Sequence, residues 1–189
     1  RRCRMTLEEK QQHLVLLKRK LAEACLFEKT HGTIMFGVGT PEADLMIIGD
    51  SPGRTPDAGN LLKGVLARLQ KPLAECYITN VVKFRKKATE ADRDLMSPFL
   101  FAQIFLIQPK VILTLGGAPT EVITGAAGRM GHLRQMTRLR YSDSKHSLEI
   151  PVVSTWHPTY CLTQAPENKK PLANFIEDVR RALEVSNAD

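Results

Sequence analysis

Residues 45–53 read Leu-Met-Ile-Ile-Gly-Asp-Ser-Pro-Gly, a short apolar run that ends abruptly in small, polar and turn-forming residues. Three more apolar runs, each bounded by residues that interrupt regular structure, lie at 76–82, 111–115 and 152–155. Runs that are apolar at nearly every position, rather than at alternate ones, are typical of strands buried on both faces. The four runs therefore predict a parallel sheet covered by helices.

Helical patterns fill the segments between these runs and lie at both ends of the chain. Their apolar residues recur at three- and four-residue spacing, over 6–27, 59–70, 89–107, 120–127 and 171–185. Thr89 and Asp92 match the capping box that opens many helices. Strands that alternate with helices predict a three-layer α/β/α domain.

The size and composition of the chain are those of one globular domain. It has 189 residues, of which 43% are hydrophobic and 25% charged. We expect a single domain over 1–189, with an N-terminal helix at 6–27 and an α/β core at 28–185. The longest apolar run is interrupted by Gln103, so no membrane-spanning segment is expected.

The charge and the cysteines bear on partners and compartment. The formal net charge is +7, which favours polyanions such as nucleic acid, although a basic protein without that role would have the same charge. The four cysteines form no CxxC pair, and residues 1–4 contain no apolar stretch like that of a secretory signal. We therefore expect a reduced, intracellular protein, with its compartment left open.

Polar residues follow three of the apolar runs at the point where each strand should end. They are Asp50, Asn80 and His157. The carboxyl ends of parallel strands share one edge of a sheet, so these residues should converge there. Asp can orient water or stabilise positive charge, Asn can hydrogen-bond the edge of a base, and His can donate to an oxygen that gains negative charge. The trio suggests hydrolysis or binding of a polar heterocycle.

Four segments, in this order, resemble the uracil-DNA glycosylase superfamily. They are Gly-Asp-Ser-Pro-Gly at 49–53, Tyr-Ile-Thr-Asn-Val-Val-Lys at 77–83, Pro-Lys-Val-Ile-Leu-Thr-Leu-Gly at 109–116 and His-Pro-Thr-Tyr-Cys-Leu at 157–162. The nearest branch is family 4, and the resemblance runs from about residue 25 to residue 183. It implies a central four-stranded parallel sheet flanked by helices.

The resemblance also implies a role for individual residues. Asp50 takes the place of the family's Glu, the acid associated with the attacking water or the cationic sugar. Asn80 takes the place of the residue that binds the flipped base, and His157 that of the residue that stabilises the departing base anion. Gly49 and Ser51 would complete the base pocket. The expected DNA contacts are Pro52, Gly53, Lys83, Arg85, Lys86, Lys87, Pro158 and Leu162, with Leu162 on the loop that enters the duplex.

Family 4 usually carries an iron–sulfur cluster, and this sequence departs from that pattern. Only Cys25 falls on a cluster position, while Ala22, Phe84 and Ser97 stand where the other cysteines would be. Because a [4Fe–4S] cluster normally needs four thiolates, we expect no cluster, no metal site and no other cofactor. Packing by Phe84 is a hypothetical substitute for the cluster.

The loop after Gly53 is shorter than in the family and lacks the aromatic residue that would stack on uracil. Trp156 or Tyr160 could supply a ring, or either could belong to the core. Asp57 could be a second carboxylate or an ordinary turn residue. A second basic segment at 129–140 could contact phosphates or be a solvated face, and the longer segment around it, 128–150, could form a hairpin.

The resulting hypothesis is a monofunctional glycosylase that hydrolyses the N-glycosidic bond of uracil or a related deaminated base in DNA. The alternative is an inactive member of the fold that binds nucleic acid or serves in an assembly. A nucleotide hydrolase or transferase of the same architecture is a third class, weakened by the absence of phosphate-binding glycine motifs. The expected partner is DNA, with single-stranded DNA, RNA and a protein partner left open.

Overall fold

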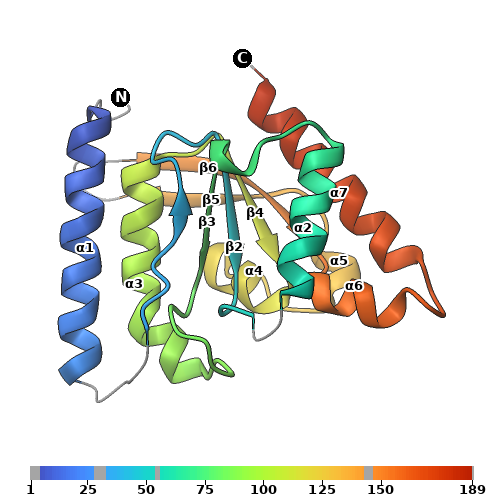
Figure 1. The fold of residues 1–189 in the computed structure, drawn as a ribbon, viewed down its shortest axis with the longest axis horizontal. Helices are drawn as coiled ribbons and strands as arrows, with labels where there is room; N and C mark the ends of the chain where they lie inside the picture. Colours follow the sequence, from blue (N-terminus) through green and yellow to red (C-terminus); the bar gives the residue numbers. More distant parts are fainter. Residues whose placement is uncertain (1–4, 28–32, 54–55, 143–146, 189) are drawn as a thin grey trace.

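The structure is a computed structural model that describes residues 5–27, 33–53, 56–142 and 147–188. A six-stranded sheet with the order β1-β3-β2-β4-β6-β5 lies at its centre (Figure 1). The middle strands are mutually parallel, as predicted: β3 (Cys76–Asn80), β2 (Leu45–Gly49), β4 (Val111–Leu115) and β6 (Ser147–Thr155). The predicted four-stranded parallel sheet is therefore confirmed as the core of a larger one.

The two edge strands run antiparallel to their neighbours and were not part of the predicted sheet. The two-residue strand β1 (Val38–Gly39) pairs with β3, and β5 (Thr137–Ser142) pairs with β6. Strand β1 is too short to leave an apolar pattern in the sequence. The β5–β6 pair is the hairpin considered for the second basic segment.

Helices cover both faces of the sheet. The helices α1 (Leu7–Phe27), α3 (Glu90–Ile107) and α4 (Gly117–Thr124) contribute to one core layer, with Met46, Ile48 and Ile112. The helices α2 (Asp57–Arg68), α6 (Pro158–Gln164) and α7 (Lys170–Asn187) contribute to the other, with Leu45, Ile47 and Val111. Successive strand residues point to opposite faces, so this alternation confirms the three-layer arrangement.

Among the described residues, five helices lie close to the predicted ranges and three short helices are additional. These are α5 (Met130–Leu133), α6 and the 3-10 helix η1 (Leu73–Glu75). The predicted capping box of α3 is present, because Thr89 Oγ1 accepts from the Asp92 N–H and Asp92 Oδ2 accepts from the Thr89 N–H. None of the helices in the described part of the chain combines the length and apolar character that crossing a bilayer requires.

Candidate active site

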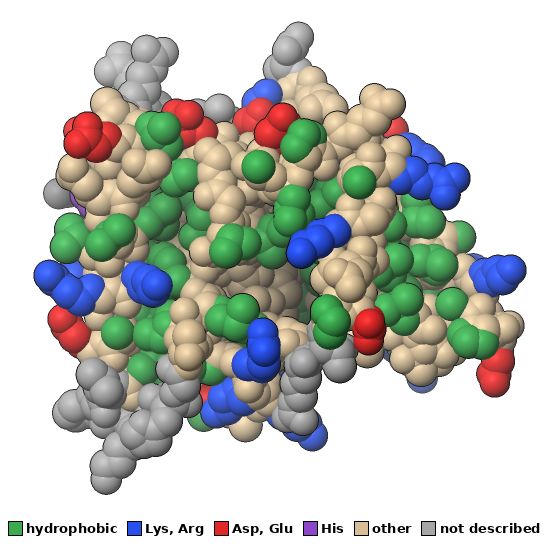
Figure 2. All heavy atoms as spheres, in the orientation of Figure 1, with side chains coloured by type: hydrophobic (Ala, Val, Ile, Leu, Met, Phe, Trp, Pro, Cys, Tyr) green, Lys and Arg blue, Asp and Glu red, His purple; other side chains and the backbone are tan. Residues whose placement is uncertain are grey.

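A cavity of about 870 Å³ opens at the carboxyl ends of β2 and β3. Its walls come from α1, residues 34–39, β3, the start of α2 and the start of α6. Figure 2 shows this face of the molecule hollowed near its centre, with Lys and Arg side chains around the lower part. The predicted site residues that line the cavity are Gly49, Ser51, Pro52, Gly53, Asn80, Arg85, His157 and Pro158. Segments far apart in the sequence thus meet at one edge, as predicted.

Asn80 ends strand β3, directly beside Gly49 at the end of β2. A Cβ atom added at Gly49 would lie 2.4 Å from Asn80 Oδ1, far inside van der Waals contact. The missing side chain at Gly49 therefore leaves the space that the Asn80 amide occupies. The amide offers both a donor and an acceptor to a ligand in the cavity.

His157 is the N-cap residue of α6, and its Nδ1 accepts a hydrogen bond from the Thr159 N–H at 3.2 Å. A ring nitrogen that accepts a hydrogen bond carries no proton, so the proton of the neutral ring lies on Nε2. Burial lowers the pKa of His157 and so favours this neutral form, while the nearby charge of Asp50 opposes the shift. Neutral His157 thus has one N–H left to donate. Gly116, with φ of +99°, passes close by, and a Cβ atom there would lie 3.5 Å from His157 Cβ.

The carboxylate of Asp50 is held by a bidentate ion pair. Arg93, in the first turn of α3, donates from Nε to Oδ1 and from Nη2 to Oδ2, each at 2.8 Å. The hydrogen bond with Asp50 raises the pKa of Arg93 above its already high value. Asp50 itself is outside the described cavity lining, although Gly49 and Ser51 on either side belong to it. Its charge is therefore largely matched by a guanidinium.

The predicted DNA contact at Lys83 is wrong. Lys83 is completely buried, so it cannot reach a phosphate. It lies three residues after the end of β3. Its Nζ donates hydrogen bonds to Thr79, Asn80 and Gln103 inside the protein. Residues 81–84 are all buried and exposure begins only at Arg85, and a run of basic residues in the sequence does not reveal where that boundary falls.

The remaining predicted basic contacts lie at the surface. Arg85 and Lys87 are exposed, whereas Lys86 is partly buried and its Nζ pairs with Asp92 at 2.8 Å. The carbonyl of Lys86 accepts a hydrogen bond from Ser51 Oγ at 2.9 Å, which joins the loop after β2 to the segment after β3. The hydroxyl proton of Ser51 is thus used within the protein.

The start of α6 carries the remaining predicted contacts. Leu162 is 38% exposed and lies on the helix itself, not on a loop as expected. The rings of Trp156 and Tyr160 stack on each other with centroids 4.9 Å apart, and neither is part of the described cavity lining. They therefore do not supply the missing ring. Asp57 begins α2, which fits an ordinary helix start.

Three residues of this site were missed by the sequence analysis. Phe36 and Tyr77 line the cavity, and Arg93 holds Asp50. Phe36 lies in a glycine-rich segment without hydrophobic periodicity, and nothing in the pattern of residues 76–82 distinguishes Tyr77 from the other strand residues. Arg93 did leave a signal, because a cation in the first turn of a helix is disfavoured by the helix dipole and so suggests a tertiary partner.

The cysteines do not fit the cluster that the resemblance implies. Cys25 and Phe84 belong to the core on one side of the sheet, whereas Cys76 and Cys161 belong to the core on the other side. Cys3 lies outside the described residues. Among those described, no group of three or more His, Cys, Asp or Glu side chains could hold a metal ion. The described residues thus offer no four-thiolate site.

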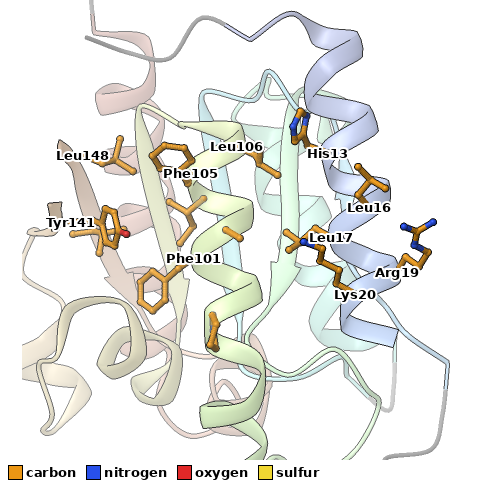
Figure 3. A pocket seen from close by; sticks show the side chains of 14 residues that line it. His13, Leu16, Leu17, Arg19, Lys20, Phe101, Phe105, Leu106, Tyr141 and Leu148 are labelled. Atoms are coloured by element: carbon orange, nitrogen blue, oxygen red, sulfur yellow. The ribbon is translucent and has the colours of Figure 1, made fainter. Parts of the chain in front are cut away.

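A second hollow, of about 740 Å³, is mainly apolar and runs across α3 between α1 and the β5–β6 hairpin. Figure 3 shows Leu16 and Leu17 of α1, Phe101 and Phe105 of α3, and Leu148 of the hairpin around it. None of the predicted site residues lines it.

In the second basic segment, Arg134 forms an ion pair of 2.7 Å with the buried Asp178, so this side chain is held within the protein.

The fold and the site together define an α/β protein with a cavity at the carboxyl edge of its sheet, lined in part by Asn80 and His157. The sequence model of the uracil DNA glycosylase superfamily matches residues 36–180, and the chain belongs to this family. The chain is similar to the type-4 uracil-DNA glycosylase of Sulfurisphaera tokodaii, with 32% identity over 76% of this chain and 72% of the relative. It is also similar to the type-4 uracil-DNA glycosylase of Pyrobaculum aerophilum, with 27% identity over 83% of this chain and 89% of the relative. The enzyme of that name from Thermotoga maritima is 25% identical over 94% of this chain and 96% of the relative.

Proposed function

We propose that this protein removes uracil, or a related deaminated base, from DNA by hydrolysing the N-glycosidic bond. The observation that carries the proposal is the convergence of Asn80 and His157 on one cavity, with Nε2–H of His157 left as a donor. Water supplies a hydroxyl group to C1′ of the sugar, the electron pair of the C1′–N bond stays on the base, and the remaining proton of the water neutralises the base anion after it has left. A donor at the base oxygen stabilises the transition state more than the substrate, because negative charge develops there.

In this proposal Asn80 hydrogen-bonds the edge of the flipped base, and His157 donates to the base oxygen that gains charge. Asp50 orients the water or stabilises the cationic sugar, with its carboxylate held in place by Arg93. Both carboxylate oxygens of Asp50 already accept hydrogen bonds from Arg93, so we assign Asp50 a positioning and electrostatic part in preference to full proton abstraction.

The proposed DNA contacts are the exposed cations beside the cavity and the start of α6. Arg85 and Lys87 would bind backbone phosphates, and the exposed Leu162 would take the space that the flipped base leaves. Flipping costs a few kcal/mol and less in a mispaired or single-stranded region. Single-stranded DNA and U:G duplexes are therefore the substrates to test first.

We further propose that the protein works without an iron–sulfur cluster, with apolar packing around Phe84 and Cys25 in its place. Iron and acid-labile sulfide analysis of anaerobically purified protein tests this. We expect neither element in stoichiometric amount, and about four of each per chain would refute the proposal.

An inactive, DNA-binding member of the family is the second candidate. The Asp50–Arg93 ion pair and the lack of a described aromatic in the loop after Gly53 favour it. The two candidates differ in one assay, which is alkali-revealed cleavage of uracil-containing oligonucleotides.

The assay compares the parent with Asp50→Asn and His157→Ala, and uses His13→Ala as a matched control. His13 is an exposed histidine on α1 at the other hollow. Cleavage by the parent and by His13→Ala, lost in the other two variants, supports the enzyme. If the parent binds DNA in a salt-sensitive way but does not cleave it, the enzyme hypothesis is wrong and the inactive, DNA-binding candidate takes its place.

A further inference from the structure

Lys83 is among the largest side chains that are completely buried in the described part of the chain. Its Nζ lies 2.7 Å from Thr79 Oγ1, 2.6 Å from Gln103 Oε1 and 2.5 Å from the carbonyl oxygen of Asn80. The ring of Phe36 lies on a further side, with its centroid 5.7 Å from Nζ. These groups come from β3, from α3 and from the segment before β1, so the lysine joins three parts of the chain.

The surroundings of Nζ are neutral, and they match an ammonium group. Thr79 Oγ1 donates its own proton to the Phe36 carbonyl, and Gln103 Nε2 donates to Phe36 and Tyr77, so both groups can only accept from Lys83. Three acceptors fit the three N–H bonds of an ammonium, whereas an uncharged amine has only two. Burial lowers the pKa of Lys83 well below that of a free lysine, but the hydrogen-bond pattern favours the charged form.

No carboxylate pairs with Lys83 among the described residues. An unpaired buried charge is costly, and a core of apolar side chains would be more stable. Features that weaken a fold in this way are expected mainly at functional sites. The position of Lys83 therefore calls for a role beyond packing.

The lysine lies directly beneath the cavity described above. It binds the main chain of Asn80, and its network reaches Thr79, Tyr77 and Phe36, all of which line the cavity. A charge in such a low-dielectric site acts on its surroundings far more strongly than a charge in water. Its field is present before the reaction starts, so no reorganisation is needed when the base departs.

We propose that Lys83 is a positioning residue that fixes Asn80 and places a positive charge under the departing base. The inference rests on the proposed function, because it needs a base that leaves with negative charge. Lys83 touches no substrate in this scheme and acts through the main chain of Asn80.

The test compares single-turnover excision of uracil and of 5-fluorouracil from the same oligonucleotide. The fluorine withdraws electrons, so 5-fluorouracil is the better leaving group and needs less stabilisation by the protein. Lys83→Met removes the charge at similar length. Gln103→Glu keeps an acceptor for Lys83 and adds a negative charge that cancels the field of the ammonium group. It remains informative if a thermal melt shows that Lys83→Met does not fold.

Both variants should lose about tenfold to a hundredfold in the rate with uracil, less than the effect of removing a donor that touches the reacting oxygen. The loss with 5-fluorouracil should be several times smaller. Tyr77→Phe is the matched control, because it disturbs the same network and leaves the charge in place. It should change both rates by the same factor.

The two hypotheses can fail separately. If the parent excises uracil and both charge variants lose the same factor with either base, Lys83 only supports the fold and the inference is wrong. If the parent excises neither base, the proposed function is wrong and the inference fails with it.

Discussion

Replacing Gly49 by alanine tests whether the position of the Asn80 amide governs activity. The added Cβ atom would lie 2.4 Å from Asn80 Oδ1, whereas ordinary contacts begin near 3.4 Å. The amide must therefore move by about 1 Å. Because Oδ1 is the end of a side chain, this movement leaves the backbone of β3 in place.

The expected outcome is a stable protein with a slow reaction. A displacement of about 1 Å in a catalytic arrangement can lower a rate about 100-fold. Alanine also restricts the unfolded chain, so the free energy of unfolding should change by less than about 1 kcal/mol. Single-turnover excision of uracil and urea unfolding measure the two quantities independently.

Gly64→Ala is the matched control, because a Cβ atom there meets no atom within 4 Å. Gly64 lies inside α2, where alanine should stabilise the helix by about 0.5–1 kcal/mol without changing the rate. A Gly49→Ala protein that folds and excises uracil within about threefold of the parent would contradict the assigned role of Asn80.

Three further predictions concern the ion pair, the histidine and the core. Arg93→Ala should lower excision about tenfold in the parent but add little to the loss caused by Asp50→Asn, because Arg93 acts through Asp50; additive losses in the double-mutant cycle would contradict this. The pKa of His157 is lowered in the folded protein, so the unfolded chain binds the proton more readily and stability should fall as the pH drops below about 6.5. Urea unfolding at pH 7.5 and 5.5 should show a smaller decline for His157→Asn, and an equal decline would show that this ring is not the cause. Phe84→Ala should cost about 3–5 kcal/mol in urea unfolding, because the ring is 3% exposed in the core that also contains Cys25, and a loss below about 1 kcal/mol would refute its packing role.

The sequence by itself was sufficient for the parallel core and for the sheet edge at which Asn80 and His157 meet. Buried parallel strands need an apolar residue at almost every position, and runs such as 45–48 and 111–115 show this directly. The convergence of Asn80 and His157 followed from the rule that parallel strands end at a common edge. Both predictions used only local patterns, because each apolar run and the polar residue that follows it are neighbours in the chain.

Only the tertiary structure decided which side chains face one another at that edge. Lys83 stands in the sequence beside exposed cations, yet it is buried beneath the cavity. Arg93 lies 43 residues from Asp50, and Phe36 reaches Lys83 from before the first strand. A residue's local pattern reflects its periodic burial, whereas its partners depend on how distant segments pack, and that packing is a property of the whole chain.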